Sequence, residues 1–527
     1  MTRAELLQSL VRQPVYDLVV VGGGATGLGV ALDAALRGFS VALLESQDFA
    51  GGTSSRSTKL LHGGVRYLAQ GNVALVREAL AERATVLRIA PHLAQPLPFV
   101  MPSYHWWQTP FYGMGLKLYD LMAGRAGLGR TAFLSRAETL AALPGANPEG
   151  LQGGVRYWDG QFDDARLALA LARSAEAAGA RVLNYMEVTG LRRQSAAPGA
   201  LTELDALDRL SGARYGLQAR CVVNATGVWV DDLRSLARHA AVDPPTERMV
   251  SPSQGVHVVV DREFMPGDHA LLIPKTRDGR VLFAVPWLGK LILGTTDTPR
   301  QDLPREPQAF DEELAFILGE AGRVLRRPVR TEDIRSIWVG LRPLVAPPST
   351  SQGGTKVLSR EHTIVVDGNG LVTVTGGKWT TYRAMAEDVL ERCFAAGLLA
   401  RRPGGASAGH RLLGAPAAGA PAVALHAPPG PHLYGSCARE LDACPGNALS
   451  LGMGLTEAMV RYGVRSEYVL SVEDMLARRW RVLFLDARAA TRLAPRVADI
   501  LREEGVADPG LSPFLSLCER YLPPAGR

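Results

Sequence analysis

The chain has 527 residues, of which 47% are hydrophobic and 21% are charged, so we expect two to four globular domains and exclude a disordered or collagen-like chain. Lys and Arg number 58 against 52 for Asp and Glu, and a net charge of +6 over this length does not by itself indicate nucleic acid. The excess suits an anionic small substrate or an anionic membrane surface.

The five cysteines form no C-x-x-C pair and no metal-ligand spacing, so the sequence predicts no metal site. An odd number of cysteines favours a reducing compartment. Residues 1–14 contain Glu5 and two arginines and lack the apolar core of a secretory signal. No long apolar stretch is free of charge or of heavy glycine content. We therefore expect a cytoplasmic protein that is soluble or peripheral on the inner face of the cell membrane.

The first expected element is a buried strand over residues 16–21 (YDLVVV), followed at once by Gly22, Gly24 and Gly27 as G-x-G-x-x-G. A helix of small residues over 25–38 and a second strand over 40–44 complete a βαβ unit. This context predicts a dinucleotide site with the pyrophosphate at the helix N-terminus. Glu45 follows the second strand, where a carboxylate accepts hydrogen bonds from the adenosine ribose.

The rest of the chain changes character twice. Short alternating runs between about 248 and 344 predict an antiparallel sheet, and a segment rich in Pro, Gly and Ala over 401–431 predicts a linker. The other expected elements are a helix over 164–178, strands over 181–185 and 220–224, and C-terminal helices over 447–462, 472–484 and 495–504. Asp163 or Asp164 is interpreted as the N-cap of the first of these helices.

The segment 48–68 (DFAGGTSSRSTKLLHGGVRYL) distinguishes FAD from NAD, because an NAD enzyme does not need such a loop directly after the second strand. The loop resembles that of the FAD-dependent, quinone-linked glycerol-3-phosphate dehydrogenases, within the D-amino-acid-oxidase-like flavoproteins. The resemblance continues in QFDDARL (161–167), NATGV (224–228), GVHV (255–258), GTTD (294–297), GLRPL (340–344) and GGKWTTYR (376–383). It covers about 16–391 and is weaker in the C-terminal tail.

The resemblance implies an α/β fold with a Rossmann-type FAD-binding domain, an interleaved antiparallel-sheet substrate domain and an all-helical C-terminal domain. We assign residues 1–100, 150–247 and 345–398 to the FAD-binding domain, 101–149 and 248–344 to the substrate region, 399–431 to the linker and 432–527 to the C-terminal domain. FAD is expected to be bound non-covalently, because the family motif places no His or Cys attachment point at the loop.

The expected cofactor-binding residues come from the glycine turn (22–27), the flavin loop (48–68) and two later turns, the NATGV turn (224–228) and the GGK turn (376–378). They are Gly22, Gly24, Ala25, Thr26, Gly27, Glu45, Thr53, Ser54, Ser55, Lys59, Leu60, His62, Ala225, Gly227, Gly377 and Lys378.

A phosphorylated alcohol needs a phosphate clamp and a base for its hydroxyl. Arginine suits the phosphate, and Arg342 and Arg66 are the leading candidates. The family resemblance places Arg66, Tyr67, Arg342 and Lys378 around the substrate. We favour His257 over His62 as the base. His257 is expected on the opposite face of its strand from Val256 and Val258.

The segment 104–122 (YHWWQTPFYGMGLKLYDLM) is unusually aromatic. A core helix and an interfacial element at the membrane surface are both open, and we lean to the second because the family resemblance implies membrane quinone as the electron acceptor.

The sequence thus predicts oxidation of sn-glycerol 3-phosphate to dihydroxyacetone phosphate, with electrons passed through FAD to quinone. One alternative is a glycerol-3-phosphate oxidase that uses oxygen, whose soluble members carry an inserted segment that this chain lacks. A D-amino-acid-type oxidase is more distant, and a non-catalytic flavin-binding protein is the alternative from another class. The sequence leaves a homodimer open.

Overall fold

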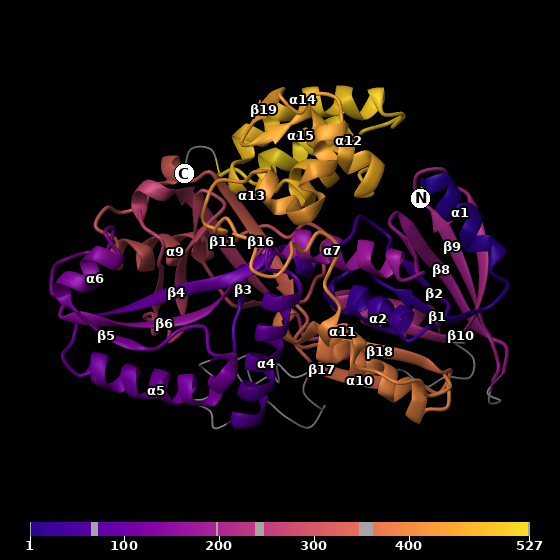
Figure 1. The fold of residues 1–527 in the computed structure, drawn as a ribbon, viewed down its shortest axis with the longest axis horizontal. Coiled ribbons are helices and arrows are strands. Elements are labelled where there is room, and N and C mark those ends of the chain that lie inside the picture. Colours follow the sequence, from indigo (N-terminus) through magenta and orange to yellow (C-terminus); the bar gives the residue numbers. More distant parts are fainter. Residues whose placement is uncertain (1, 65–71, 196–198, 238–246, 347–361, 525–527) are drawn as a thin grey trace.

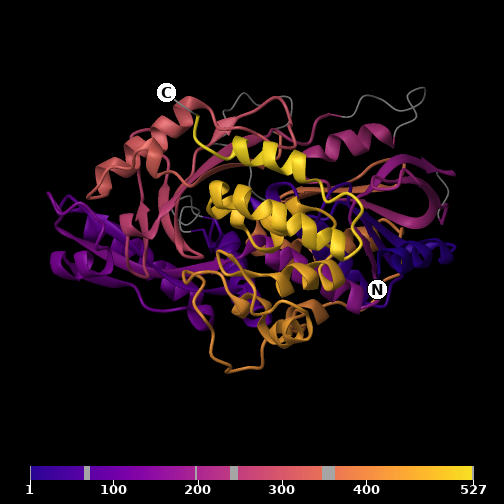
Figure 2. The same ribbon diagram turned by 90° about the horizontal axis from the view of Figure 1, so that it is seen from above.

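The computed structural model describes residues 2–64, 72–195, 199–237, 247–346 and 362–524. Two large β-sheets lie side by side, and a helical C-terminal unit, residues 431–524, lies above them (Figure 1). Seen from above, the C-terminal helices cross the middle of the molecule (Figure 2). Within the described part of the chain, no helix has both the length and the apolar character needed to cross a bilayer.

The first sheet has a parallel centre in which β1 runs beside β2 and β10, with Val21 level with Leu44 and with Asn224. Its strands, in spatial order, are β17 (His362–Val366), β18 (Leu371–Gly376), β10 (Arg214–Asn224), β1 (Tyr16–Val21), β2 (Val41–Leu44) and β7 (Arg181–Leu183), with β9 (Thr202–Asp208) and β8 (Met186–Arg193) added antiparallel at the start of β10. The expected βαβ unit is therefore present. Apolar side chains pack on both faces of β1, as in a strand at the centre of a parallel sheet.

Helices cover both faces of this sheet, as its apolar strands require. One face packs against α2 (Ala25–Leu36), α7 (Asp164–Ala177) and α10 (Tyr382–Ala395), and the other against α1 (Arg3–Arg12) and α8 (Val230–Leu236). Asp163 is the N-cap of α7, since its carboxylate accepts from the Arg166 N–H at 3.2 Å. The remaining elements of this part are η1 (Thr53–Ser55), η3 (Gly227–Trp229), η7 (Trp379–Thr381) and α11 (Ala406–Gly409).

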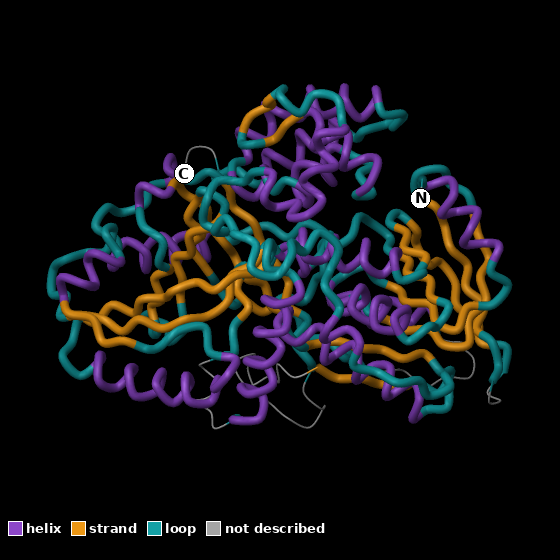
Figure 3. Tube along the Cα trace, in the orientation of Figure 1, coloured by secondary structure: helices purple, strands orange, loops and turns teal. Residues whose placement is uncertain are grey.

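The second sheet forms the other group of strands in Figure 3 and is mostly antiparallel. In spatial order its strands are β15 (Thr298–Pro299), β11 (Ser253–Asp261), β14 (Lys290–Gly294), β13 (Leu282–Trp287), β12 (Ala270–Ile273), β4 (Ala94–Ser103), β6 (Gly153–Phe162) and β3 (Leu60–Leu61), with β16 (Ser336–Arg342) beside β11 and β5 (Ala132–Ser135) beside β6. Strands β3 and β6 and most of β4 thus belong to this second sheet, although they lie in the ranges 1–100 and 150–247, which we assigned to the FAD-binding domain.

Alternation along β11 places its side chains in two different cores. Val256 and Val258 pack with α9 (Asp311–Val324), whereas Val259 packs on the side of the C-terminal unit. The other helices around this sheet are α4 (Val73–Ile89), α5 (Gln108–Ala123), η2 (Gly124–Ala126), α6 (Arg136–Ala142), η4 (Arg262–Phe264) and η5 (Thr331–Asp333).

The C-terminal unit is helical apart from one short hairpin, β19 (Ser450–Gly452) with β20 (Leu455–Thr456). Its helical elements are η8 (Pro431–Ala443), α12 (Glu457–Ser466), the π-helical segment η9 (Asp474–Arg479), α13 (Val482–Leu485), α14 (Ala487–Glu503) and α15 (Leu511–Arg520). The predicted helix starts at 447 and 495 are wrong. Asp486 caps α14 and Pro495 lies inside it, while Thr456 caps α12.

Candidate functional site

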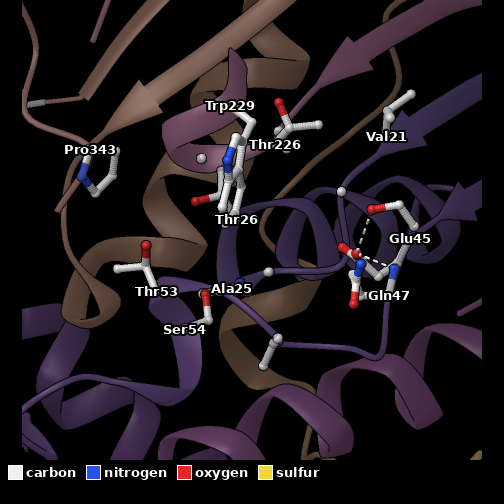
Figure 4. A pocket seen from close by; sticks show the side chains of 18 of the residues that line it. Val21, Ala25, Thr26, Glu45, Gln47, Thr53, Ser54, Thr226, Trp229 and Pro343 are labelled. Carbon is white, nitrogen blue, oxygen red and sulfur yellow. Dashed lines mark hydrogen bonds between the residues drawn. The ribbon is translucent and has the colours of Figure 1, made fainter. Parts of the chain in front are cut away.

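A cavity of about 490 Å³ lies where β1, β2 and β10 end and α2 begins (Figure 4). Ligands of open α/β sheets bind at this edge, outside the carboxyl ends of the parallel strands. The cavity is lined by residues within 21–26, 44–47, 50–54, 186–188, 225–236, 305–306, 343 and 374–379, together with Glu473 and Arg478.

The glycine turn brings the start of α2 to the cavity. Gly22 has a φ of +110°, and a Cβ there would lie 2.5 Å from the Ala225 carbonyl oxygen. A Cβ on Gly27 would collide with the Gly22 carbonyl, so close packing of helix and strand requires both glycines. Gly24 is the N-cap and contributes no side chain, which leaves the helix N-terminus and its positive dipole exposed to an anion.

Glu45 occupies the position expected for a ribose-binding carboxylate. Its Oε2 accepts from the Gly23 N–H at 2.7 Å, and its Oε1 accepts from the Gln47 N–H at 2.8 Å. Desolvation raises the pKa of Glu45 above its ordinary value, against these two hydrogen bonds and the nearby Arg305. The carboxylate is thus held in a fixed orientation at one part of the cavity.

The described part of the flavin loop passes along the cavity at Thr53 and Ser54. Ser54 Oγ accepts from the Ala25 N–H at 2.9 Å, and the Ser54 carbonyl accepts from Trp379 Nε1 at 2.9 Å. Thr53 Oγ1 donates to the Leu341 carbonyl at 2.6 Å. These bonds fix the loop between α2, η7 and β16.

The GGK turn forms another wall. Gly376 and Gly377 have φ values of +80° and +72°, a conformation that favours glycine, and both line the cavity with Lys378. Ala225 and Gly227, from the NATGV turn, lie beside them along the lining.

The structure brings together most of the expected cofactor residues. Those lining the cavity are Gly22, Gly24, Ala25, Thr26, Glu45, Thr53, Ser54, Ala225, Gly227, Gly377 and Lys378. Gly27, Ser55, Lys59, Leu60 and His62 are outside the lining. Arg66 and Tyr67 lie outside the described residues.

Lys59, in the later part of the flavin loop, is fully buried. Its Nζ donates to Asp164 Oδ2 at 2.7 Å and to the Ser55 carbonyl at 2.8 Å, and it lies 4.5 Å from the centre of the Trp338 ring. Burial lowers the pKa of Lys59 to about 7, although the carboxylate of Asp164 opposes this shift. In this position the ammonium stabilises the conformation of the loop.

His257 lies on the face of β11 opposite to Val256 and Val258, as its alternation predicts, but that face is buried as well. Its ring stacks on Trp338 with centroids 4.0 Å apart, and Nε2 lies 2.9 Å from Thr58 Oγ1. Burial, followed by the charges of Lys59 and Arg342, holds the pKa of His257 well below its ordinary value. The imidazole is therefore neutral at pH 7.

Arg342 ends β16, and the next residue, Pro343, lines the cavity. The guanidinium donates to the Thr296 carbonyl at 2.9 Å and to Asp297 Oδ1 at 3.2 Å. Although Arg342 is outside the lining, the end of its strand reaches the cavity wall.

Several lining residues were not predicted from the sequence. Trp229 follows the NATGV motif directly, so the strand end could have indicated it. Arg305 and Glu306 belong to the loop between β15 and α9, and Arg478 to η9, and no local pattern marks them.

The residues present fit a long dinucleotide such as FAD, because one cavity combines a helix N-terminus, a carboxylate after the second strand of the βαβ unit and glycine-lined walls. Among the described residues, no cluster of three or more His, Cys, Asp or Glu side chains could hold a metal ion.

Comparison with protein families gives two matches. Residues 17–383 match the family described as FAD dependent oxidoreductase, and residues 431–508 match the C-terminal domain of alpha-glycerophosphate oxidase.

Curated proteins similar to this chain include two mitochondrial glycerol-3-phosphate dehydrogenases. That of Bos taurus is 39% identical over 95% of this chain and 72% of its own length. That of Arabidopsis thaliana is 39% identical over 93% of this chain and 82% of its own length.

Among solved structures, the glycerol-3-phosphate dehydrogenase from Bacillus halodurans complexed with FAD has a TM-score of 0.76 and 28% identity, and the match covers 100% of this chain and 98% of that one. Glycine oxidase from Geobacillus kaustophilus shares the fold, with a TM-score of 0.51 and 22% identity over 74% of this chain and 96% of its own.

Proposed function

Since the chain belongs to the family of FAD-dependent glycerol-3-phosphate dehydrogenases, we propose that it oxidises sn-glycerol 3-phosphate to dihydroxyacetone phosphate and passes the electrons to membrane quinone. The observation that carries the proposal is 39% identity to such an enzyme over 95% of the chain. The dinucleotide cavity supports it independently, because FAD is the cofactor and the cavity residues suit its diphosphate and ribose.

The chain's own residues hold the cofactor in a defined orientation. The N-terminus of α2 binds the diphosphate, Glu45 binds the ribose, and Thr53 and Ser54 lie along the path to the GGK turn. When FAD is bound, its isoalloxazine ring supplies the acceptor for the hydride of the substrate carbon.

His257 is the proposed base for the substrate hydroxyl. Because its pKa is held low, the ring is neutral and can accept a proton. Thr58 engages Nε2, whereas Nδ1 has no hydrogen-bond partner among the described residues. We therefore assign the accepted proton to Nδ1, with Trp338 stacked on the ring to fix its plane.

Four residues are proposed to bind the substrate phosphate. Arg342 and Lys378 lie in the part of the chain that the structure describes, and Arg66 and Tyr67 lie outside it. Lys378 lines the cavity, and Arg342 adjoins it through Pro343. A planar guanidinium can donate two parallel hydrogen bonds to a phosphate, which fixes the substrate relative to the base.

The electron acceptor is proposed from a surface feature of α5 and the residues before it. Trp106 is 82% exposed, Phe111 62% and Leu121 77%, and together with Trp107, Met114 and Leu118 they form an apolar patch on this segment. Such a face suits an interfacial helix and would bring the enzyme to the quinone pool. The core-helix alternative is less favoured, because a core helix would bury these side chains.

The test is an anaerobic titration of the purified holoenzyme with sn-glycerol 3-phosphate, followed by the visible absorbance of the flavin. We expect bleaching by this substrate, none by glycerol or D-alanine, and recovery of the absorbance when a quinone analogue is added. Bleaching by D-alanine, or none by glycerol 3-phosphate, would contradict the proposed substrate.

The oxidase alternative is supported by the match of residues 431–508 to the C-terminal domain of alpha-glycerophosphate oxidase. In aerated buffer without quinone, an oxidase would form one hydrogen peroxide for each substrate oxidised. We expect far less peroxide than this and rapid turnover only with the quinone analogue, and stoichiometric peroxide would instead assign oxygen as the acceptor.

A further inference from the structure

A short stretch of the substrate-side loop lies against the cofactor cavity. This closing segment, Leu303–Glu306, belongs to the loop between β15 and α9, and its residues Arg305 and Glu306 line the cavity. The segment therefore closes a site whose other walls come mainly from the first sheet and the flavin loop.

Trp229 joins the closing segment to the first sheet. Its indole Nε1 donates to the Leu303 carbonyl at 3.1 Å, and the Arg305 guanidinium lies over its ring, 4.2 Å from the centroid. A Cβ on Gly52 would lie 3.0 Å from the same ring, so the indole also packs on the flavin loop. Figure 4 shows the side chains of Trp229 and of Thr26, at the start of α2, among the residues that line the cavity.

Glu306 holds the other end of the closing segment. It forms an ion pair with Arg56 of the flavin loop, and Arg56 also donates to the Arg305 carbonyl at 3.4 Å. From the C-terminal unit, Arg520 donates to the Glu306 carbonyl at 3.2 Å and Tyr521 donates to its carboxylate at 3.3 Å. The backbone that presents Arg305 is thus fixed from several sides.

Charge distinguishes Arg305 from the other cations of the lining. Arg478 is committed to the carboxylates of Asp48, Asp474 and Glu473. Lys378 belongs to the GGK turn, which forms another wall of the cavity. No carboxylate of the described residues forms an ion pair with Arg305, and its positive charge is felt by Glu45. A guanidinium held on an aromatic face, in the cavity that the N-terminus of α2 also lines, suits a diphosphate.

We propose that Arg305 is an FAD-binding residue that pairs with the diphosphate, and that the closing segment holds the cofactor in place from the substrate side. The N-terminus of α2 provides N–H donors and a dipole but no full charge, and Arg305 supplies one. Trp229 acts as its platform and limits the guanidinium to one plane.

The test measures FAD binding, so it does not depend on the proposed substrate. Apoprotein is titrated with FAD by flavin fluorescence, with ADP and adenosine as competitors. Arg305→Gln keeps a planar group for Trp229 and removes the charge, while Arg305→Ala removes both. Arg300→Ala is the matched control, because Arg300 lies on the same loop, pairs with Asp302 and does not line the cavity.

We expect both Arg305 variants to bind FAD and ADP about ten- to hundredfold more weakly, since a charge-assisted hydrogen bond is lost. Adenosine affinity should be unchanged, and FAD binding should depend less on salt than in the wild type. Wild-type affinity for FAD in Arg305→Gln would overturn the proposal. An equal loss in Arg300→Ala, or an equal loss for adenosine, would also overturn it by assigning the effect to the loop's packing.

Discussion

The guanidinium of Arg481 donates to the carbonyl oxygen of Ser55 at 2.6 Å, which joins the C-terminal unit to the flavin loop immediately after its cavity-lining residues. Lys59 donates to the same oxygen from the loop side. Arg481 and Lys59 both have left-handed backbone conformations, with φ values of +62° and +65°, and both side chains are fully buried. Two buried basic side chains on residues with left-handed backbones therefore meet at one carbonyl, and tertiary contacts offset the backbone strain.

Replacing Arg481 by Met should destabilise the protein strongly. The buried carboxylate of Asp164 would lose one of its two cationic neighbours, and removing one partner from a buried charge cluster costs about 3–5 kcal/mol. Urea unfolding of the holoenzyme measures the change. Arg492→Ala is the control, because Arg492 is exposed on α14 of the same unit. Equal stability of the two variants would show that the cluster contributes little.

A second prediction concerns His257. His257→Gln should lower kcat by about 10²–10⁴-fold if the imidazole is the base, with the flavin spectrum unchanged. Thr58→Val should have a smaller effect, because it removes only the contact that orients Nε2. Steady-state kinetics with bound FAD quantified by absorbance separate catalysis from cofactor loss. Full activity in His257→Gln would reassign the base, with His62 next in order.

The same assignment fixes a pH dependence. The pKa of His257 is held well below 6.5, so the proton-accepting form persists as the pH falls through neutrality. The kcat/KM of the wild type should therefore show no decline from protonation of this ring between about pH 8 and 6.5. A wild-type acid limb centred near 6.5 that disappears in His257→Gln would contradict this environment for the ring.

Local patterns in the sequence predicted the centre of the first sheet, at β1, β2, β7 and the end of β10, and much of the cavity lining, but not β8, β9, β17 or β18. β1, the glycine turn and α2 have their own period and turn residues within about thirty positions, which is why Gly22, Glu45 and Ser54 could be placed in advance. The NATGV and GGK turns were included because of the family resemblance, and the structure places them after β10 and β18, two strands that run parallel.

Long-range contacts explain what the sequence did not reveal. Arg305 reaches the cavity only because Trp229 and Arg56 hold its loop there, and neither contact leaves a mark on neighbouring residues. The sequence predicted that a helix begins at Pro495, but Asp486 caps this helix nine residues earlier. The helix continues through Pro495 because its apolar face, which includes Val497, is buried.

His92 should make stability fall in acid. Burial, followed by the charges of Arg166 and Arg411, lowers its pKa to about 3. The unfolded chain, with an ordinary pKa near 6.5, therefore binds a proton that the folded chain does not. Stability contributed by this group is complete above about pH 6.5 and falls by up to about 1.4 kcal/mol per pH unit between 6.5 and 3.

The measurement compares the wild type with His92→Gln by urea unfolding at pH 7, 6 and 5. The wild-type slope should be steeper below pH 6.5, since Gln does not titrate. His92 packs against the linker at Gly414, so the substitution also carries a packing cost that does not depend on pH. Parallel pH profiles would contradict a buried neutral His92.

The exposed face of α5 gives the last prediction. Phe111 and Leu121 are 62% and 77% exposed, and inserting each side chain into a bilayer interface would contribute about 1.5–3 kcal/mol. Phe111→Ser with Leu121→Ser should therefore weaken binding to phosphatidylglycerol-containing vesicles by at least about a hundredfold in a flotation assay. Turnover with a water-soluble acceptor should stay at the wild-type rate, because neither residue lines the cavity. Leu449→Ser is the matched control, a 56% exposed leucine on the C-terminal unit. If Leu449→Ser reduced vesicle binding as much as the α5 double variant, the attachment would not be specific to α5, and the route to membrane quinone would have to be sought on another face.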